Sequence, residues 1–158
     1  MVKVESIEKL LAEHQFFKDM PDYVLKTVVG CGKNERYEAG DFIAHEGEKA
    51  DKFYLIRTGT VALEFHVGNE DIVVETQHAG EVVGWSWLVE PYVWSCDLRA
   101  TELTRVISLD AACLRKKMKK DSAFGFDLYS RFAPLIAHRL HHAHQQLTDM
   151  YASNAKAK

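Results

Sequence analysis

Residues 39–61 read Ala-Gly-Asp-Phe-Ile-Ala-His-Glu-Gly-Glu-Lys-Ala-Asp-Lys-Phe-Tyr-Leu-Ile-Arg-Thr-Gly-Thr-Val, and they are the best guide to the fold. Glycines divide this stretch into short apolar segments, at 42–44 and 53–56. From Glu35 onward the apolar residues recur with a period of two, which is the spacing of a β-strand with one buried face. Short apolar segments bounded by turn residues predict strands joined by tight turns.

The same pattern continues along the chain toward the C-terminus. Further short apolar segments lie at 61–65, 72–74 and 105–109, with glycines between several of them. Some seven or eight short strands at such regular spacing imply a sandwich or a barrel. We interpret the fold as mainly β with flanking α: a double-stranded β-helix, or jelly roll.

Helical patterns flank this β region. Apolar residues between 5 and 29 recur at steps of three and four, and Pro21 is placed to begin a second helix at its first turn. Gly30-Cys31-Gly32 ends this helical region. We therefore predict one domain, 1–158. It divides into N-terminal helices (1–34), a β-roll (35–110) containing a pocket segment (80–100), and C-terminal helices (111–158).

The last helix carries apolar residues at steps of three and four, as a coiled-coil seam does. A second stripe, Leu128, Phe132 and Leu135, is predicted to pack on the β-roll, and Pro134 is expected to kink the helix. An exposed apolar stripe usually finds a partner, so we predict a homodimer. We call its predicted interface the apolar seam, which consists of Ile136, Leu140, Ala143, Leu147 and Met150.

Composition and charge exclude several classes of protein. The chain has 158 residues, 47% hydrophobic and 27% charged, as in an ordinary globular domain. A net charge of -3 gives no general attraction to nucleic acid or to an anionic membrane. Cys31, Cys96 and Cys113 are odd in number and lack a C-x-x-C spacing, so we expect a reducing cytoplasm and neither a disulfide nor a zinc site.

The pattern G-D-x-I-x-x-x-G-E-x-A-D-x-x-Y-x-I-x-x-G-x-V is met at nearly every position of 39–61, and it resembles the cyclic-nucleotide-binding domain of the catabolite-activator and cAMP-receptor family. The resemblance covers essentially the whole chain. It implies a non-enzymatic regulatory or sensor module in which ligand capture is relayed to the long C-terminal helix. Transcription factors of that family continue into a helix-turn-helix domain, whereas only residues 151–158 follow Met150 here, so we expect no DNA binding by this chain alone.

The pocket segment departs from that family. The resemblance implies a Glu that binds the ribose and an Arg that binds the cyclic phosphate. Trp85 occupies the Glu position, and Trp94 occupies the Arg position, or Val93 does if the loop slips by one residue. Strand alternation places Arg99 on the opposite face from Trp94. Losing one charge-assisted contact costs about 1.5–3 kcal/mol, roughly 10- to 150-fold in affinity, so we expect cAMP and cGMP to bind poorly or not at all.

Other parts of the segment still predict a pocket. Gly84 permits a sharp bend, after which backbone N–H groups converge on one spot, and Ser95 offers a hydroxyl. The three tryptophans either line an open pocket or fill it, which would leave a closed structural relic and a protein-interaction domain. The candidate ligand-binding residues are Val83, Gly84, Trp85, Ser86, Trp87, Leu88, Val93, Trp94, Ser95 and Cys96.

The sequence argues against catalytic and metal sites. His138, His141, His142 and His144 crowd one helix, but no Cys or carboxylate joins them within a turn, so we interpret them as a solvated or interface cluster. A cupin-like metal enzyme would need a second His beside His45. We expect no catalytic residues and no cofactor. The expected partners are a second copy of the chain and an unidentified small effector or protein, with no membrane.

Overall fold

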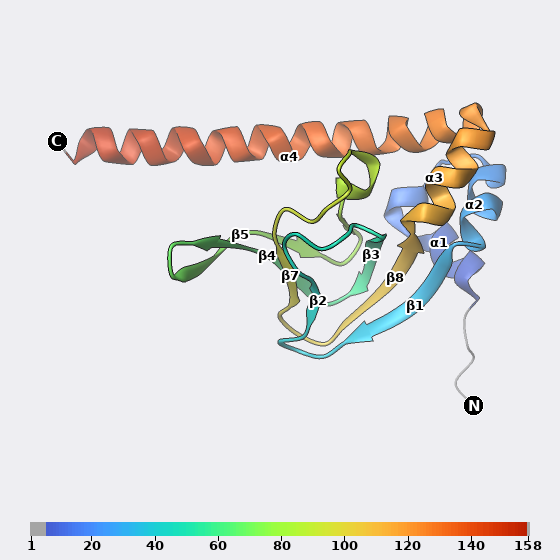
Figure 1. Cartoon of the computed structure of the whole chain (residues 1–158), viewed down its shortest axis with the longest axis horizontal. Coiled ribbons are helices and arrows are strands. Elements are labelled where there is room, and N and C mark those ends of the chain that lie inside the picture. Colours follow the sequence, from blue (N-terminus) through green and yellow to red (C-terminus); the bar gives the residue numbers. More distant parts are fainter. Residues whose placement is uncertain (1–5, 158) are drawn as a thin grey trace.

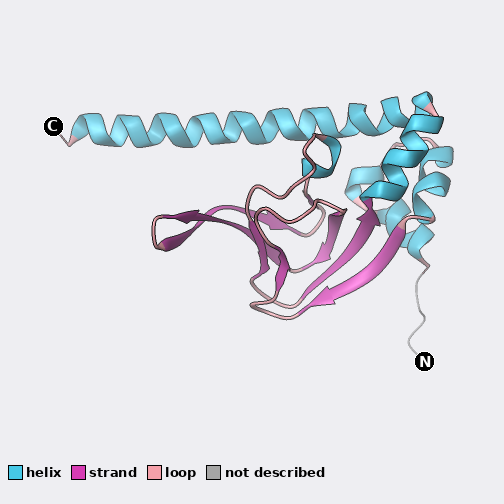
Figure 2. Ribbon diagram, in the orientation of Figure 1, coloured by secondary structure: helices cyan, strands magenta, loops and turns pink. Residues whose placement is uncertain are grey.

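Two antiparallel four-stranded sheets form the centre of the molecule, and helices flank them (Figures 1 and 2). The computed structural model describes residues 6–157. The strand orders are β1-β8-β3-β6 and β2-β7-β4-β5, and the jelly-roll prediction is confirmed. The strands are β1 (Gly32–Tyr37), β2 (Phe42–Ala44), β3 (Lys52–Thr58), β4 (Thr60–Val67), β5 (Glu70–His78), β6 (Val82–Val83), β7 (Asp97–Ala100) and β8 (Thr104–Asp110).

Gly59 is the point at which the chain crosses from one sheet to the other. It lies between β3 and β4, which belong to different sheets, and its φ is +91°. A Cβ atom at this position would lie 2.6 Å from the backbone of Thr104 and from the carbonyl oxygen of Leu103. Only glycine has both the backbone freedom and the absence of a side chain that this crossing requires.

The N-terminal region forms three short helical elements. They are α1 (Ile7–Glu13), the 3-10 helix η1 (Gln15–Phe17) and α2 (Asp22–Val29). The helical prediction for 5–29 is confirmed in outline, although residue 5 lies outside the described residues. Nδ1 of His14 accepts a hydrogen bond from the Phe16 backbone N–H at 3.2 Å, which caps η1 and separates it from α1. Pro21 directly precedes α2, and so marks the start of a second helix as expected.

An aromatic cluster joins the pocket segment to the β-roll and to the C-terminal helix. Trp87 stacks on Phe53 of β3 with ring centroids 4.7 Å apart, and Phe132 meets both rings edge-on at 5.3 and 5.2 Å. Phe16 packs against Phe132 at 4.9 Å. Trp87, Phe53 and Phe132 are fully buried. Such a cluster adds about 0.5–1.5 kcal/mol per pair beyond the burial of apolar area.

The C-terminal region contains α3 (Ala111–Lys120) and the 35-residue α4 (Ser122–Lys156). Leu128 and Phe132 are buried, which confirms the stripe predicted to pack on the β-roll. Pro134, which is expected to kink this helix, lies inside α4 and does not end it. Phe132 and the partly buried Leu135, on either side of the proline in sequence, pack this part of the helix against the domain.

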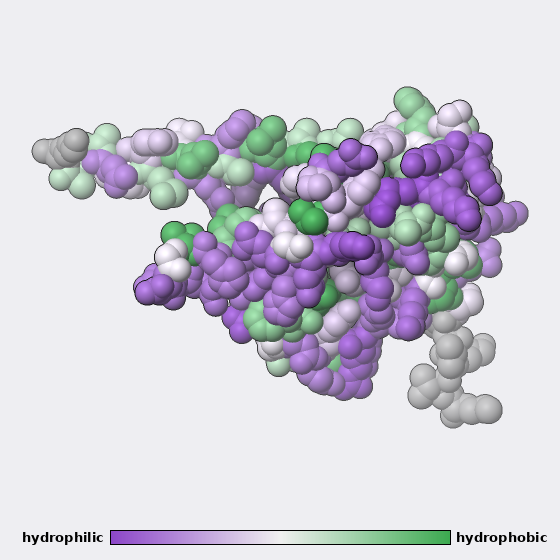
Figure 3. All heavy atoms as spheres, viewed as in Figure 1, coloured by the Kyte–Doolittle hydropathy of each residue, from purple (hydrophilic) through white to green (hydrophobic). Residues whose placement is uncertain are grey.

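The second part of α4 lies apart from the core. The buried residues of α4 all belong to its first third, and the last is Phe132. Leu140, Leu147 and Met150 are 56%, 51% and 64% exposed. Figure 3 shows hydrophobic side chains along this projecting part. In the described part of the chain, no helix has both the length and the apolar character that a membrane crossing needs.

One disulfide overturns the prediction of three unpaired cysteines. Cys31, just before β1, is bonded to Cys113 of α3, with a Cα–Cα distance of 6.0 Å across 82 residues of sequence. The Asp110 N–H donates to the Cys31 carbonyl at 2.9 Å, which brings the end of β8 beside the start of β1. Sequence spacing cannot reveal such a pairing. Disulfides are rare in cytosolic proteins, so the cytoplasmic location stays a prediction that has lost its main support.

Candidate ligand-binding site

The pocket segment runs from a strand through a glycine turn, a short helical turn and a loop into a second strand. After β6, Gly84 has a φ of +97°, and the 3-10 helix η2 (Ser86–Leu88) follows. A loop with a cis Glu90–Pro91 peptide bond then leads to β7. A Cβ atom on Gly84 would lie 2.5 Å from the Trp94 ring, so glycine at this turn is what lets the indole lie across the backbone.

A cavity of about 340 Å³ lies beside Trp85 and Trp94, and we call it the indole cavity. It is bordered by β4, β5, the pocket segment and α4. Its walls are mainly apolar, and its size is at the lower end of the roughly 300–1,000 Å³ typical of ligand pockets. The lining residues are Leu63, Phe65, Val74, Glu75, Val83, Gly84, Trp85, Ser86, Trp94, Ser95, Cys96, Leu98, Ile136, Arg139, Leu140 and Ala143.

Seven of the ten candidate ligand-binding residues line the indole cavity: Val83, Gly84, Trp85, Ser86, Trp94, Ser95 and Cys96. Three do not. Trp87 and Leu88 are buried in the hydrophobic core, and Val93 is 36% exposed and pairs with Lys49 in an isolated bridge. Nε1 of Trp87 is the one buried side-chain polar atom without a hydrogen-bond partner among the described residues.

The tryptophans therefore divide between the two roles that the sequence left open. Trp87 is a core residue, whereas Trp85 and Trp94 border the indole cavity. Trp94 is 5% exposed and stacks on Tyr54, with ring centroids 6.2 Å apart. Its backbone is held on both sides, because its N–H donates to Glu48 and its carbonyl accepts from Gly47. This indole is a fixed wall of the cavity.

Arg99 lies away from the cavity, as the strand alternation predicts. Its guanidinium donates to both oxygens of Glu64, at 2.8 and 3.0 Å, and lies over the Phe42 ring at 5.0 Å. Glu64 is 4% exposed, so this pair is largely removed from water. Arg99 is committed to the other face of the sheet and is not available to a ligand in the indole cavity.

Asp97, on the same outer face, is surrounded by donors. Its Oδ1 accepts from the Glu46 N–H at 2.7 Å, and its Oδ2 lies 3.2 Å from Nε2 of His66. Burial alone would raise the pKa of Asp97, but the Glu46 N–H and the neighbouring histidines outweigh it and lower that pKa. His66 also bonds Asp71, and this hydrogen bond is the main cause of its raised pKa. The cluster is a structural brace outside the cavity.

Arg139 of α4 is the residue that sequence reasoning missed. Its side chain is 12% exposed; Nη2 donates to the Val82 carbonyl, and Nε lies 3.8 Å from Oε1 of Glu75. Burial lowers the pKa of the guanidinium, and the charges of Glu75 and Glu81 offset part of that effect. Helical spacing gave a usable signal, because residue 139 shares a face with Ile136 and Ala143. The apolar seam was defined by its apolar residues alone, so the charged Arg139 on the same helix face was left out.

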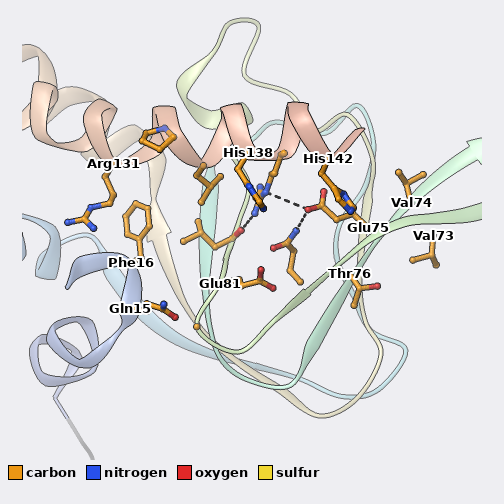
Figure 4. A pocket seen from close by; sticks show the side chains of 16 residues that line it. Gln15, Phe16, Val73, Val74, Glu75, Thr76, Glu81, Arg131, His138 and His142 are labelled. Carbon is orange, nitrogen blue, oxygen red and sulfur yellow. Dashed lines mark hydrogen bonds and ion pairs between the residues drawn. The ribbon is translucent and has the colours of Figure 1, made fainter. Parts of the chain in front are cut away.

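A second, more polar depression lies on the other side of Arg139, and we call it the larger groove (Figure 4). It has a volume of about 780 Å³ and runs between α4, β5 and the turn at Gly80. His138 and His142 line it, whereas His141 and His144 do not. Val74, Glu75 and Arg139 line both spaces, so the Arg139–Glu75 pair stands between them.

Two further observations limit the chemistry of this region. Burial raises the pKa of the Cys96 thiol to about 11, so this cavity wall residue is neutral and weakly nucleophilic at neutral pH. Within residues 6–157, no group of three or more His, Cys, Asp or Glu side chains is arranged to hold a metal ion. The cavity is suited to binding, with stacking walls and one ion pair.

Comparison with known proteins agrees with the fold. The sequence profile described as cyclic nucleotide-binding domain matches residues 34–121. A crystal structure of a candidate cyclic nucleotide-binding protein from Geobacter metallireducens GS-15 superposes with a TM-score of 0.76 at 30% identity, over 87% of this chain and 99% of that one. The Thermus thermophilus catabolite activator protein has a TM-score of 0.66 at 22% identity, over 84% of this chain and 61% of that one, which supports the fold alone.

A curated relative extends the similarity to a larger protein. Human cGMP-dependent protein kinase 2 is 28% identical over 112 residues, which is 70% of this chain. The match spans only 14% of the kinase, so the likeness concerns one part of that protein.

Proposed function

This chain belongs to the cyclic nucleotide-binding domain family, and we propose that it is a regulatory sensor module, without catalytic activity, whose indole cavity binds a small flat molecule. The observation that carries the proposal is the open cavity beside Trp85 and Trp94, which has α4 as one wall. Similarity to a kinase named for its dependence on cGMP supports a regulatory role.

The ligand is proposed to differ from an ordinary cyclic nucleotide. The resemblance places a Glu and an Arg where this chain has Trp85 and Trp94, and Trp94 is a fixed wall of the cavity. Arg99 is held by Glu64 on the far face of the sheet. Neither polar anchor has a replacement within the pocket segment, while indole faces favour stacking with a flat ring system.

The signal is proposed to pass through α4. Ile136, Leu140 and Ala143 line the cavity and belong to the apolar seam, so a bound molecule would contact the same helix face that we propose for the homodimer. Arg139 ties α4 to the Val82 carbonyl of β6, directly before the Gly84 turn. A helix with two alternative positions, biased by ligand, is the element that such a relay needs.

The proposed dimer rests on the exposed part of the seam. Leu147 and Met150 lie beyond the cavity and are 51% and 64% exposed. Leu147→Asp is expected to give a folded monomer in light scattering, whereas Gln145→Asp, at an exposed position outside the seam, should stay dimeric. A wild-type monomer at micromolar concentration would contradict the proposal. These exposed residues also favour the second candidate function, a protein-interaction domain whose cavity binds nothing.

Filling the cavity separates the two candidates. We would titrate 2-phenylethanol, a small flat neutral probe, and follow tryptophan fluorescence excited where phenyl rings do not absorb. A saturable change in tryptophan fluorescence is expected in the wild type and in the control Ala137→Phe. Ala137 is exposed and lines neither the indole cavity nor the larger groove. Ala143→Phe should abolish this change, because Ala143 lines the cavity. No saturable change in the wild type would favour the interaction domain.

A further inference from the structure

Glu75 and Arg139 are the two charged residues among the described residues that line the indole cavity. Every other lining residue is apolar, aromatic, glycine, serine or cysteine. Glu75 comes from β5 and Arg139 from α4, so the two sides of the cavity each contribute one charge of opposite sign. A ligand that enters beside Trp85 and Trp94 meets this pair at the boundary with the larger groove.

The ion pair between Arg139 and Glu75 has a long contact distance. Nε of Arg139 and Oε1 of Glu75 are 3.8 Å apart, which is too long for a hydrogen bond. Of the five guanidinium N–H groups, only the donor to the Val82 carbonyl has a hydrogen-bond partner in the described chain. Oε1 of Glu75 accepts from Gln77 at 2.5 Å, while its Oε2 accepts no hydrogen bond from the described residues. Both groups therefore have unused capacity toward a ligand.

A ligand with one charge would bind one partner of the pair directly and would offer the other partner no direct contact in exchange for the loose one. A ligand with both charges avoids this, because each member of the pair exchanges a loose contact for a direct one. Glu81 also faces Arg139, from the larger groove, and it remains there as a second counter-charge. A zwitterion is the ligand that gives both Arg139 and Glu75 a direct partner.

The apolar walls add the second requirement. Trp85, Trp94 and Phe65 offer aromatic surface, and a cavity of about 340 Å³ suits a molecule the size of a single amino acid. Resting on the proposed sensor function, we propose that the indole cavity selects a small aromatic zwitterion such as an aromatic amino acid. Its ring packs against Trp85 and Trp94, its carboxylate binds Arg139, and its ammonium group binds Glu75.

The test uses four probes that share one phenyl ring: L-phenylalanine, 3-phenylpropionate (no ammonium), 2-phenylethylamine (no carboxylate) and 2-phenylethanol (neutral). Each is titrated into the full chain, with tryptophan fluorescence and calorimetry as readouts. L-phenylalanine is expected to bind at least about tenfold more tightly than either singly charged probe, the lower end of the effect of a charge-assisted hydrogen bond. Affinities that agree within threefold across the charged probes would overturn the inference.

Variants assign each charge. Arg139→Gln should remove the preference for L-phenylalanine over 2-phenylethylamine, and Glu75→Gln should remove its preference over 3-phenylpropionate. Arg131→Gln is the matched control, since Arg131 is on α4 but lines only the larger groove and donates to the Lys18 carbonyl. Should Arg139→Gln fail to fold by circular dichroism, Glu75→Gln still decides. An unchanged preference in a folded variant would overturn the assignment.

The neutral probe separates this inference from the proposed function. If 2-phenylethanol binds but L-phenylalanine binds no better, the cavity is a binding site and the zwitterion inference is wrong. If none of the four probes binds, both the sensor function and the inference are wrong.

Discussion

Residues 39–61 and the pocket segment at 80–100 lie side by side in the β-roll, where β2 pairs with β7 and β3 with β6, yet they carry different information. Both use glycine turns with positive φ, and they pack together through the stacked pairs Phe53–Trp87 and Tyr54–Trp94. The first matches the family pattern almost throughout, whereas the second has Trp85 and Trp94 where the resemblance implies a Glu and an Arg. Turn glycines and core contacts determine the shape, and a few cavity-facing side chains determine what can bind.

Trp87 is assigned to the core and Trp85 to the indole cavity, and this division would be wrong if Trp87 contacted a ligand. Trp87→Ala removes a fully buried ring that stacks on Phe53, and it is expected to lower the free energy of unfolding by about 3–5 kcal/mol. Trp85→Ala, at a half-buried position on the cavity, should cost about 1 kcal/mol. Urea denaturation followed by circular dichroism measures both. Equal losses would mean that the two tryptophans do not divide between core and cavity.

Glycine substitutions compare a turn in each region. At Gly84 a new Cβ would meet the Trp94 ring at 2.5 Å, whereas at Gly47 nothing lies within 4 Å. Both have positive φ, so alanine costs each about 1–2 kcal/mol through backbone strain alone. Gly84→Ala should add the displacement of Trp94, with a red shift of tryptophan emission that Gly47→Ala lacks. Identical spectra would show that Gly84 does not position the indole.

The smallest expected effect concerns the brace on the outer face. The raised pKa of His66 means that its contribution to stability is fully present below its unfolded pKa of 6.5 and is lost as pH rises through the higher folded value. His66→Asn should therefore lower the melting temperature slightly near pH 6 and hardly at all near pH 8–9, in the range where histidine titrates. Val67→Asn, at the neighbouring exposed position, should show no such pH dependence. A His66 effect that grows with pH would contradict the sign.

Much of the fold could be predicted from the sequence, because strand period and turn glycines are local signals. Each predicted apolar segment, from 42–44 to 105–109, lies in a strand. The Cys31–Cys113 bond was missed because 82 residues separate the partners and no motif links them. The expected kink at Pro134 stays a prediction, and the structure adds that α4 continues through the proline to Lys156.

The site was predicted less completely than the fold. Seven of the ten candidate residues from the segment 80–100 line the indole cavity, but the sequence did not show that Trp87 belongs to the core while Trp85 and Trp94 border the cavity. Arg139 was missed because its importance comes from contact with Glu75 and Val82, both far away in the sequence. Local patterns indicate which segments form a site, whereas the charges that complete it arrive from other elements.

The most direct test of the central claim is a calorimetric titration of the wild type and Trp85→Glu/Trp94→Arg with cAMP. Trp85 and Trp94 stand where the resemblance implies the two polar anchors of a cyclic nucleotide. We therefore expect no saturable binding below the millimolar range by the wild type, and measurable affinity in the double variant that exceeds either single change. Micromolar binding by the wild type would contradict the account, and so would a folded double variant that binds no cAMP.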